Sequence, residues 1–128
     1  MASPKLTTDE IAVLVRGALE SAAFDAYRPL ANTNVHWDSP DDSAVGCRHR
    51  DEVLERYRRG RAKGVRSHVR ETIAHGDHVL NGMSVSGAPS STPSDATVDR
   101  WQVLTADNDR VTDIRGFDTR EGAVARLK

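Results

Sequence analysis

The sequence predicts an α+β fold in which helices pack on one face of a curved sheet. The first observation is the order of the patterns, because helical patterns dominate residues 7–59 and strand patterns dominate residues 65–117. The second is the short connections between the later strands, which suit antiparallel pairing better than the long crossovers of a parallel sheet. A length of 128 residues fits a single domain spanning residues 1–128.

A capping box opens the first predicted helix. Thr7 supplies a side-chain oxygen at the N-cap, and Glu10 follows three residues later. Apolar residues then recur at helical spacing, at Ile11, Leu14, Val15, Ala18 and Ala22. The pattern predicts an amphipathic helix with one buried stripe.

Three further elements are predicted between residues 21 and 59. A shorter helix carries Phe24 and Tyr27, and Pro29 limits its extension. Alternation over residues 35–38 indicates a short strand. Residues 50–59 form a helix whose apolar side holds Val53, Leu54 and Tyr57.

Four strands and a helix complete the prediction. Residues 65–74 and 79–87 flank a Gly76-Asp77 turn and form a hairpin. A proline- and serine-rich loop over residues 87–95 leads to strands at 98–105 and 110–117. A second capping box, from Asp118 to Glu121, predicts that Asp118 is the N-cap of a closing helix.

Composition argues against several functional classes. The net charge of −1 gives no general attraction to nucleic acid or anionic lipid, although arginines and lysines outnumber acids over residues 48–70. The sequence has no long apolar run and no signal-peptide pattern at its start, so we expect no membrane association and a cytoplasmic location. The single cysteine, Cys47, has no adjacent base that would make it a nucleophile.

The ordered set of motifs resembles the nuclear transport factor 2-like superfamily, particularly its SnoaL-like branch. The matching stretches are residues 24–30, 35–40, 46–54, 74–80 and 109–124. The resemblance implies a cone-shaped, curved antiparallel sheet wrapped around the N-terminal helices, with a short C-terminal helix. It also implies a pocket beneath the helices and a homodimer that pairs through the sheet.

The resemblance directs attention to acids that could act as catalysts. Ketosteroid isomerases place an aspartate base before a proline at the end of the first strand, where this chain has Ser39 and Pro40. Asp38 lies one residue earlier, so on a regular strand it points to the opposite face. The first helix also lacks the tyrosine that stabilises the oxyanion in those enzymes. His36 is a further polar candidate on the same strand.

A late strand supplies the other catalytic candidates. SnoaL-type cyclases use a pocket acid, for which Asp99 and Asp113 are possible equivalents. Asp113 and Arg115 are two residues apart and share a strand face, as in part of the Asp-Arg-Asp network of limonene epoxide hydrolase. Their order is reversed and no clear third acid is present, so that reaction is not assigned.

The candidate ligand-binding residues are mainly aromatic. Aromatic residues are only 5% of the chain, so each is a candidate for a pocket wall or for the core. The predicted set is Phe24, Tyr27, Trp37, His68, Met83, Trp101 and Phe117. The histidines lack the Cys/His clustering of a zinc site, and we expect neither a metal nor a cofactor.

Three functions remain open from the sequence. The first is a pocket protein that binds a small apolar molecule without a complete catalytic set. The second is an isomerase, cyclase or hydrolase that uses Asp38 or Asp113 with His36 or Arg115. The third is a dimeric interaction module with a filled core. Convergence of two or more side chains in an enclosed cavity would favour the enzyme, the candidates being His36, Asp38, His68, Asp113 and Arg115. Positions on the outer sheet face would reject the enzyme, and absence of a cavity would favour the interaction module.

Overall fold

The computed structural model describes residues 7–21, 24–38, 48–86, 97–107 and 110–127. The predicted loop at 87–95, Cys47 and the Ser39-Pro40 pair lie outside the described residues. In chain order the elements are α1 (Thr8–Ser21), α2 (Phe24–Tyr27), a 3-10 turn (Arg28–Leu30), β1 (Ala31–Asp38), α3 (Arg50–Ala62), β2 (Arg66–His75), β3 (His78–Ser86), β4 (Thr97–Asp107), β5 (Arg110–Phe117) and α4 (Arg120–Arg126).

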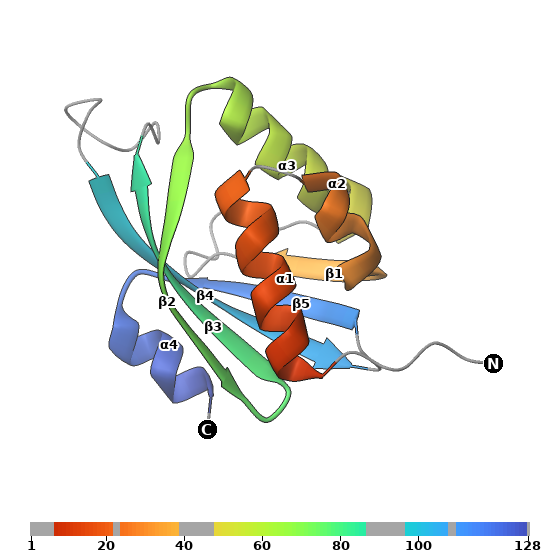
Figure 1. Ribbon diagram of the computed structural model, residues 1–128, viewed down its shortest axis with the longest axis vertical. Helices are drawn as coiled ribbons and strands as arrows, with labels where there is room; N and C mark the ends of the chain where they lie inside the picture. Colours follow the sequence, from red (N-terminus) through yellow and green to blue (C-terminus); the bar gives the residue numbers. More distant parts are fainter. Residues whose placement is uncertain (1–6, 22–23, 39–47, 87–96, 108–109, 128) are drawn as a thin grey trace.

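The predicted α+β class is confirmed, with a mixed sheet that is not closed. The strand order is β1-β5-β4-β3-β2 (Figure 1). Strands β2 to β5 pair antiparallel as predicted, but β1 pairs parallel with β5. The expected antiparallel pairing therefore holds for β2 to β5 and does not extend to β1. Its connection to β5 contains α3 and three strands, which is long enough for a parallel pair.

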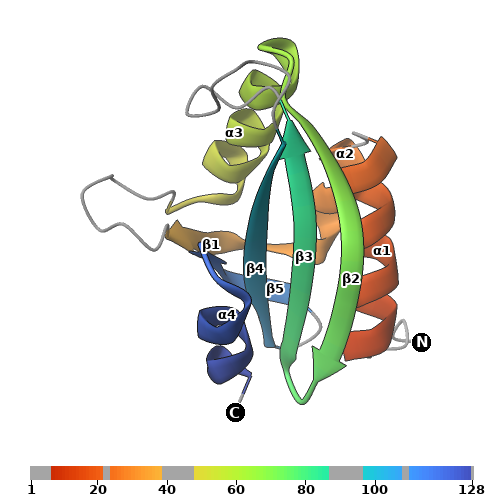
Figure 2. The ribbon, with the colours of Figure 1, turned by 90° about the vertical axis from the view of Figure 1, so that its left-hand side faces the viewer.

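Helices cover both faces of the sheet. Helix α1 packs on the concave face of β2 and β3, and α3 packs beside β1, whereas α4 packs on the outer face (Figures 1 and 2). The main apolar core lies on the concave face and includes Val15, Leu54 and Ile114. A smaller cluster of Leu80, Val103, Ala123 and Leu127 lies beneath α4. Both faces of the central strands therefore carry buried apolar side chains.

The predicted capping box of α1 is confirmed. The Thr7 backbone N–H donates to Glu10 Oε1 at 3.0 Å, and the Glu10 backbone N–H donates to Thr7 Oγ1 at 3.1 Å. These reciprocal bonds satisfy two amide groups that a helix start would otherwise leave unpaired. The hairpin prediction is also confirmed, because His75 pairs with His78 across a turn in which Gly76 has a φ of 60°.

The predicted cap of α4 is wrong by one residue. Thr119, and not Asp118, is the N-cap, and its side-chain oxygen accepts the Gly122 N–H at 3.1 Å. Arg120 then ties the helix to β2, because its guanidinium donates to Glu71 Oε1 at 2.8 Å and to Oε2 at 3.3 Å. That hydrogen bond lowers the pKa of Glu71.

The corrected cap gives a stability prediction. We expect Thr119→Ala to lower the free energy of unfolding by about 1 kcal/mol, because the Gly122 N–H loses its acceptor. Asp118→Ala, one residue earlier, should change it by less than about 0.5 kcal/mol. Urea denaturation of both variants checks the assignment. A larger loss for Asp118→Ala than for Thr119→Ala would contradict it.

Candidate functional site

A pocket of about 300 Å³ lies on the concave side of the sheet. All five strands border it, together with α1, α3 and the segment that precedes α4. The lining residues are Leu19, Trp37, Arg56, Tyr57, Val65, Ser67, Met83, Val85, Arg100, Trp101, Gln102, Gly116, Phe117 and Asp118. This volume is at the lower end of the range for small-molecule sites.

Strand alternation explains which β4 side chains face the pocket. Leu104 packs in the main core, and residues two and four positions before it share its face. These residues are Gln102 and Arg100, so two polar groups continue the inward side of a strand that begins in the core. Gln102 is only 6% exposed, whereas Arg100 lies closer to the mouth.

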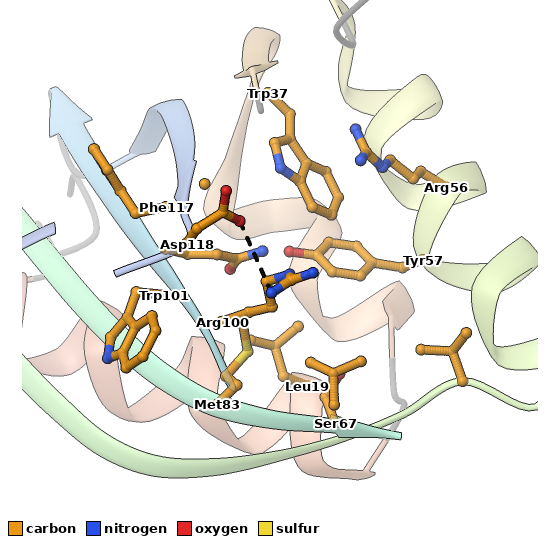
Figure 3. Close-up of a pocket in the computed structure, with 14 residues that line it drawn as sticks. Leu19, Trp37, Arg56, Tyr57, Ser67, Met83, Arg100, Trp101, Phe117 and Asp118 are labelled. Carbon is orange, nitrogen blue, oxygen red and sulfur yellow. Dashed lines mark ion pairs between the residues drawn. The ribbon is translucent and has the colours of Figure 1, made fainter. Parts of the chain in front are cut away.

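Tyr57 on α3 organises an aromatic wall. Its ring centroid lies 4.7 Å from that of Trp37, 5.3 Å from that of Phe24 and 5.6 Å from that of Tyr27. The guanidinium of Arg56 lies 4.3 Å from the centre of the Trp37 ring, a cation–π contact. In Figure 3, Trp37 and Tyr57 lie close together on one side of the pocket. Such packing fixes the wall that a ligand would contact.

Two charged residues of the pocket lining, Arg100 and Asp118, form an ion pair. Arg100 Nη1 is 3.8 Å from Asp118 Oδ1, and the same nitrogen donates to the Asp99 carbonyl at 3.1 Å (Figure 3). The side chain of Asp118 is 67% exposed, so this carboxylate meets solvent at the pocket mouth. The pocket therefore combines an apolar and aromatic wall with a buried amide and a charged rim.

The four catalytic candidates lie outside the pocket. In the parallel β1–β5 ladder His36 is opposite Asp113 and Asp38 is opposite Arg115. Trp37 and Ile114 lie between them in sequence and pack in the main core. Because strand side chains alternate, the four candidates face the outer side. Asp113 and Arg115 share one strand face, as the sequence predicts, and that face is the outer one.

The outward acids instead form surface ion pairs. Asp38 Oδ1 lies 3.0 Å from Arg48 Nη1, and Asp113 Oδ2 lies 3.8 Å from Arg126 Nη2 on α4. Asp99, the other acid considered, is 3.7 Å from Arg70. These contacts link neighbouring elements and do not bring two acids together in a cavity.

The predicted ligand-binding residues divide into three groups. Trp37 and Met83 line the pocket from the core side. Trp101 and Phe117 border it, but their rings pack in the cluster beneath α4 and point away from the pocket centre in Figure 3. Phe24, Tyr27 and His68 are not among the lining residues, since the first two pack behind Tyr57. The His68 side chain is 74% exposed and lies 3.3 Å from Glu20.

Sequence reasoning missed most of the polar pocket residues. Gln102 and Arg100 could have been found from their even spacing with Leu104, which places all three on one strand face. The helix pattern around Arg56 predicts only an apolar side with Val53, Leu54 and Tyr57, and Asp118 is predicted only as a helix cap. No local pattern indicates that the segment before α4 reaches the pocket.

The described residues provide neither a metal site nor a membrane-spanning helix. Among the residues that the structure describes, no three His, Cys, Asp or Glu side chains gather closely enough to hold a metal ion. Within the same ranges, none of the helices has the length and apolar character needed to cross a bilayer.

Comparison with known proteins identifies the fold. No protein-family model matches the sequence, and no curated protein matches it. An NTF2-like protein of unknown function from Cytophaga hutchinsonii superposes with a TM-score of 0.70 at 12% identity, covering 94% of this chain and 97% of that one. The chain has the NTF2-like fold.

Two other solved structures with this fold carry functional names. An LEH-like epoxide hydrolase of M. tuberculosis superposes with a TM-score of 0.68 at 16% identity. The match covers 94% of this chain and 88% of the hydrolase chain. A putative polyketide cyclase from Pseudomonas putida superposes with a TM-score of 0.71 at 8% identity. The match covers 96% of this chain and 99% of the cyclase chain. At these identities the likeness establishes the NTF2-like fold alone.

Proposed function

We propose that this NTF2-like domain binds a small, mainly apolar molecule in the concave pocket. The observation that carries the proposal is the pocket itself, which occupies about 300 Å³ between the helices and all five strands. Its wall is built from Leu19, Trp37, Val65 and Met83, which offer apolar surface to a ligand. An entirely filled core would leave no such space.

Binding is better supported than catalysis by the predicted acids. Asp38 and Asp113 face outward, and their partners His36 and Arg115 share that face. The carboxylate that does border the pocket, Asp118, is paired with Arg100 at the exposed mouth. A general base must lie within hydrogen-bonding reach of the proton that it removes from the substrate. Asp38 and Asp113 therefore cannot act as the base for a molecule bound in this pocket. The homodimer implied by the family resemblance stays a prediction.

A blocked pocket tests the proposal. Ser67 lies two residues before the core residue Val69 on β2 and lines the pocket. We expect Ser67→Trp to occupy the cavity and to weaken binding of any ligand found in a thermal-shift screen of small hydrophobic compounds by about tenfold or more. The measurement is the dissociation constant from isothermal titration calorimetry.

The adjacent residue provides a matched control. The His68 side chain is 74% exposed, contacts Glu20 on α1 and is not among the lining residues, so His68→Trp adds an equally large ring outside the pocket. Its ligand affinity should equal that of the natural chain. Equal affinities for both variants, or no ligand in the screen, would reject binding in this pocket.

A further inference from the structure

Gln102 is a buried polar side chain in the wall of the pocket. It is the only glutamine in the sequence, it is 6% exposed, and it lines the pocket. Its Oε1 atom has no hydrogen-bond partner among the residues that the structure describes. An amide buried without a partner is costly, so its presence at this position calls for a group that pairs with it.

The neighbouring strands extend this polar feature. Asn81 lies directly opposite Gln102 in the β3–β4 ladder and is completely buried. The Thr72 hydroxyl on β2 donates to Asn81 Oδ1 at 3.0 Å, whereas Asn81 Nδ2 has no partner within the described ranges. Three uncharged polar side chains therefore cross β2, β3 and β4, and Gln102 is the one that borders the pocket.

The charged residues of the pocket are already engaged. Arg100 contacts Asp118 and the Asp99 carbonyl, and Arg56 lies against the Trp37 ring. An anionic ligand group at the mouth would also approach the Asp118 carboxylate, which would repel it. Among the described residues, Gln102 Oε1 is a buried atom of the pocket lining that has no hydrogen-bond partner, and it belongs to a neutral amide. The side-chain amide of Gln102 can present either its carbonyl or its NH₂ group by rotation of its last bond.

We propose that the ligand carries one uncharged hydrogen-bonding group, a hydroxyl or a carbonyl, on an apolar body, and that Gln102 recognises this group. The inference rests on the proposed function and adds the chemical class of the ligand. A hydrocarbon of the same shape would displace water without replacing its hydrogen bonds, and would leave the amide unpaired.

Three probes with one ring system test the inference. Naphthalene, 2-naphthol and 2-naphthoate differ in the group that they offer: none, a neutral hydroxyl and an anion. We expect 2-naphthol to bind about tenfold more tightly than naphthalene, because one unpaired buried group weakens binding by about that factor. We also expect it to bind more tightly than 2-naphthoate.

Two further measurements assign the preference to Gln102. Gln102→Leu keeps the side-chain volume, and in this variant the affinity for 2-naphthol should become about equal to the affinity for naphthalene. Gln102→Met serves as a second variant if the first is unstable. In the natural chain, 2-naphthol should shift the single glutamine side-chain amide signal in nitrogen-15 NMR spectra. Naphthalene should leave that signal near the position it has in the free protein.

Each remaining outcome rejects the inference. Equal binding of naphthalene and 2-naphthol by the natural chain would show that the amide does not select the ligand. Tightest binding of 2-naphthoate would replace the inference with recognition of an anion. A 2-naphthol preference that persists in both Gln102 variants would assign the selection to another group. Failure of all three probes, together with failure of the hydrophobic screen, would instead overturn the proposed function.

Discussion

Replacement of Tyr57 by alanine is expected to lower the free energy of unfolding by about 3 kcal/mol. Tyr57 is partly buried, and its ring contacts Phe24, Tyr27 and Trp37 at centroid distances of 4.7–5.6 Å. Removal of the ring deletes three aromatic contacts and opens a cavity between α3 and β1. Because the Tyr57 side chain is partly exposed, we expect a loss of stability at the lower end of the range for replacement of a large buried aromatic residue by alanine. Urea denaturation measures it.

Two control variants separate the ring from other effects. Tyr57→Phe keeps the ring and should cost less than about 1 kcal/mol. Leu14→Ala removes a side chain that is 46% exposed on α1, so it should have a small effect despite the same kind of truncation. If Tyr57→Ala were no more destabilising than Leu14→Ala, the aromatic cluster would not be a structural unit.

The same substitution should also affect the pocket. Tyr57 lies on the pocket side of the cluster, with Phe24 and Tyr27 behind it. Phe24 and Tyr27, which the sequence predicted as ligand-binding residues, therefore support the pocket wall from behind. This distinction between wall and support depends on the packing of α2 against α3, which no local pattern specifies.

The sequence identified the element types because local signals agree with the fold. The capping box at Thr7 and Glu10 fixes the start of α1, and a glycine with positive φ allows the Gly76-Asp77 turn. The predicted start of α4 was one residue too early, because Asp118 and Thr119 are adjacent residues that both cap helices well. Only the hydrogen bond to Gly122 distinguishes them.

The direction of the strand faces was harder to predict. Alternation correctly placed Asp113 and Arg115 on one face of β5, but it could not show which face is inward. The ambiguity arises because α4 covers the outer face, so Val103 is as buried as its neighbour Leu104 on the opposite face. A sheet covered on both sides lacks the polar alternation that would identify its solvent face.

The parallel pairing of β1 with β5 explains why the four catalytic candidates lie on the outer face of the sheet. Once β1 lies beside β5, the core positions Trp37 and Ile114 are opposite each other and face inward together. His36, Asp38, Asp113 and Arg115 must then share the outer face. Such pairing joins strands that are far apart in sequence, and short-range patterns carry no information about it.

Alkaline pH provides the second large effect, through Tyr27. This side chain is completely buried, and burial, followed by the proximity of the Tyr57 hydroxyl, raises the pKa of Tyr27 well above its usual value. In the unfolded chain a tyrosine has a pKa of about 10. The folded state therefore holds the Tyr27 proton at a pH at which the unfolded state releases it.

The sign of the effect follows from this difference. The contribution of Tyr27 to stability is fully present below a pH of about 10, and it is lost as the pH rises toward the folded-state pKa. One proton gives a slope of up to about 1.4 kcal/mol per pH unit in this range. We expect the free energy of unfolding of the natural chain to fall more steeply above pH 10 than that of Tyr27→Phe, which has no proton to release at this position.

Denaturation by urea over a pH series of about 8–11 measures both slopes, and groups that titrate in both chains cancel in the comparison. Tyrosinate absorbance gives an independent reading, because the chain has only two tyrosines and both belong to the cluster around α3. Tyr57→Ala is expected to lower the folded-state pKa of Tyr27, since it removes the neighbouring hydroxyl and admits water to the site. Parallel stability curves for the natural chain and Tyr27→Phe would show that Tyr27 ionises as readily in the folded state as in the unfolded state.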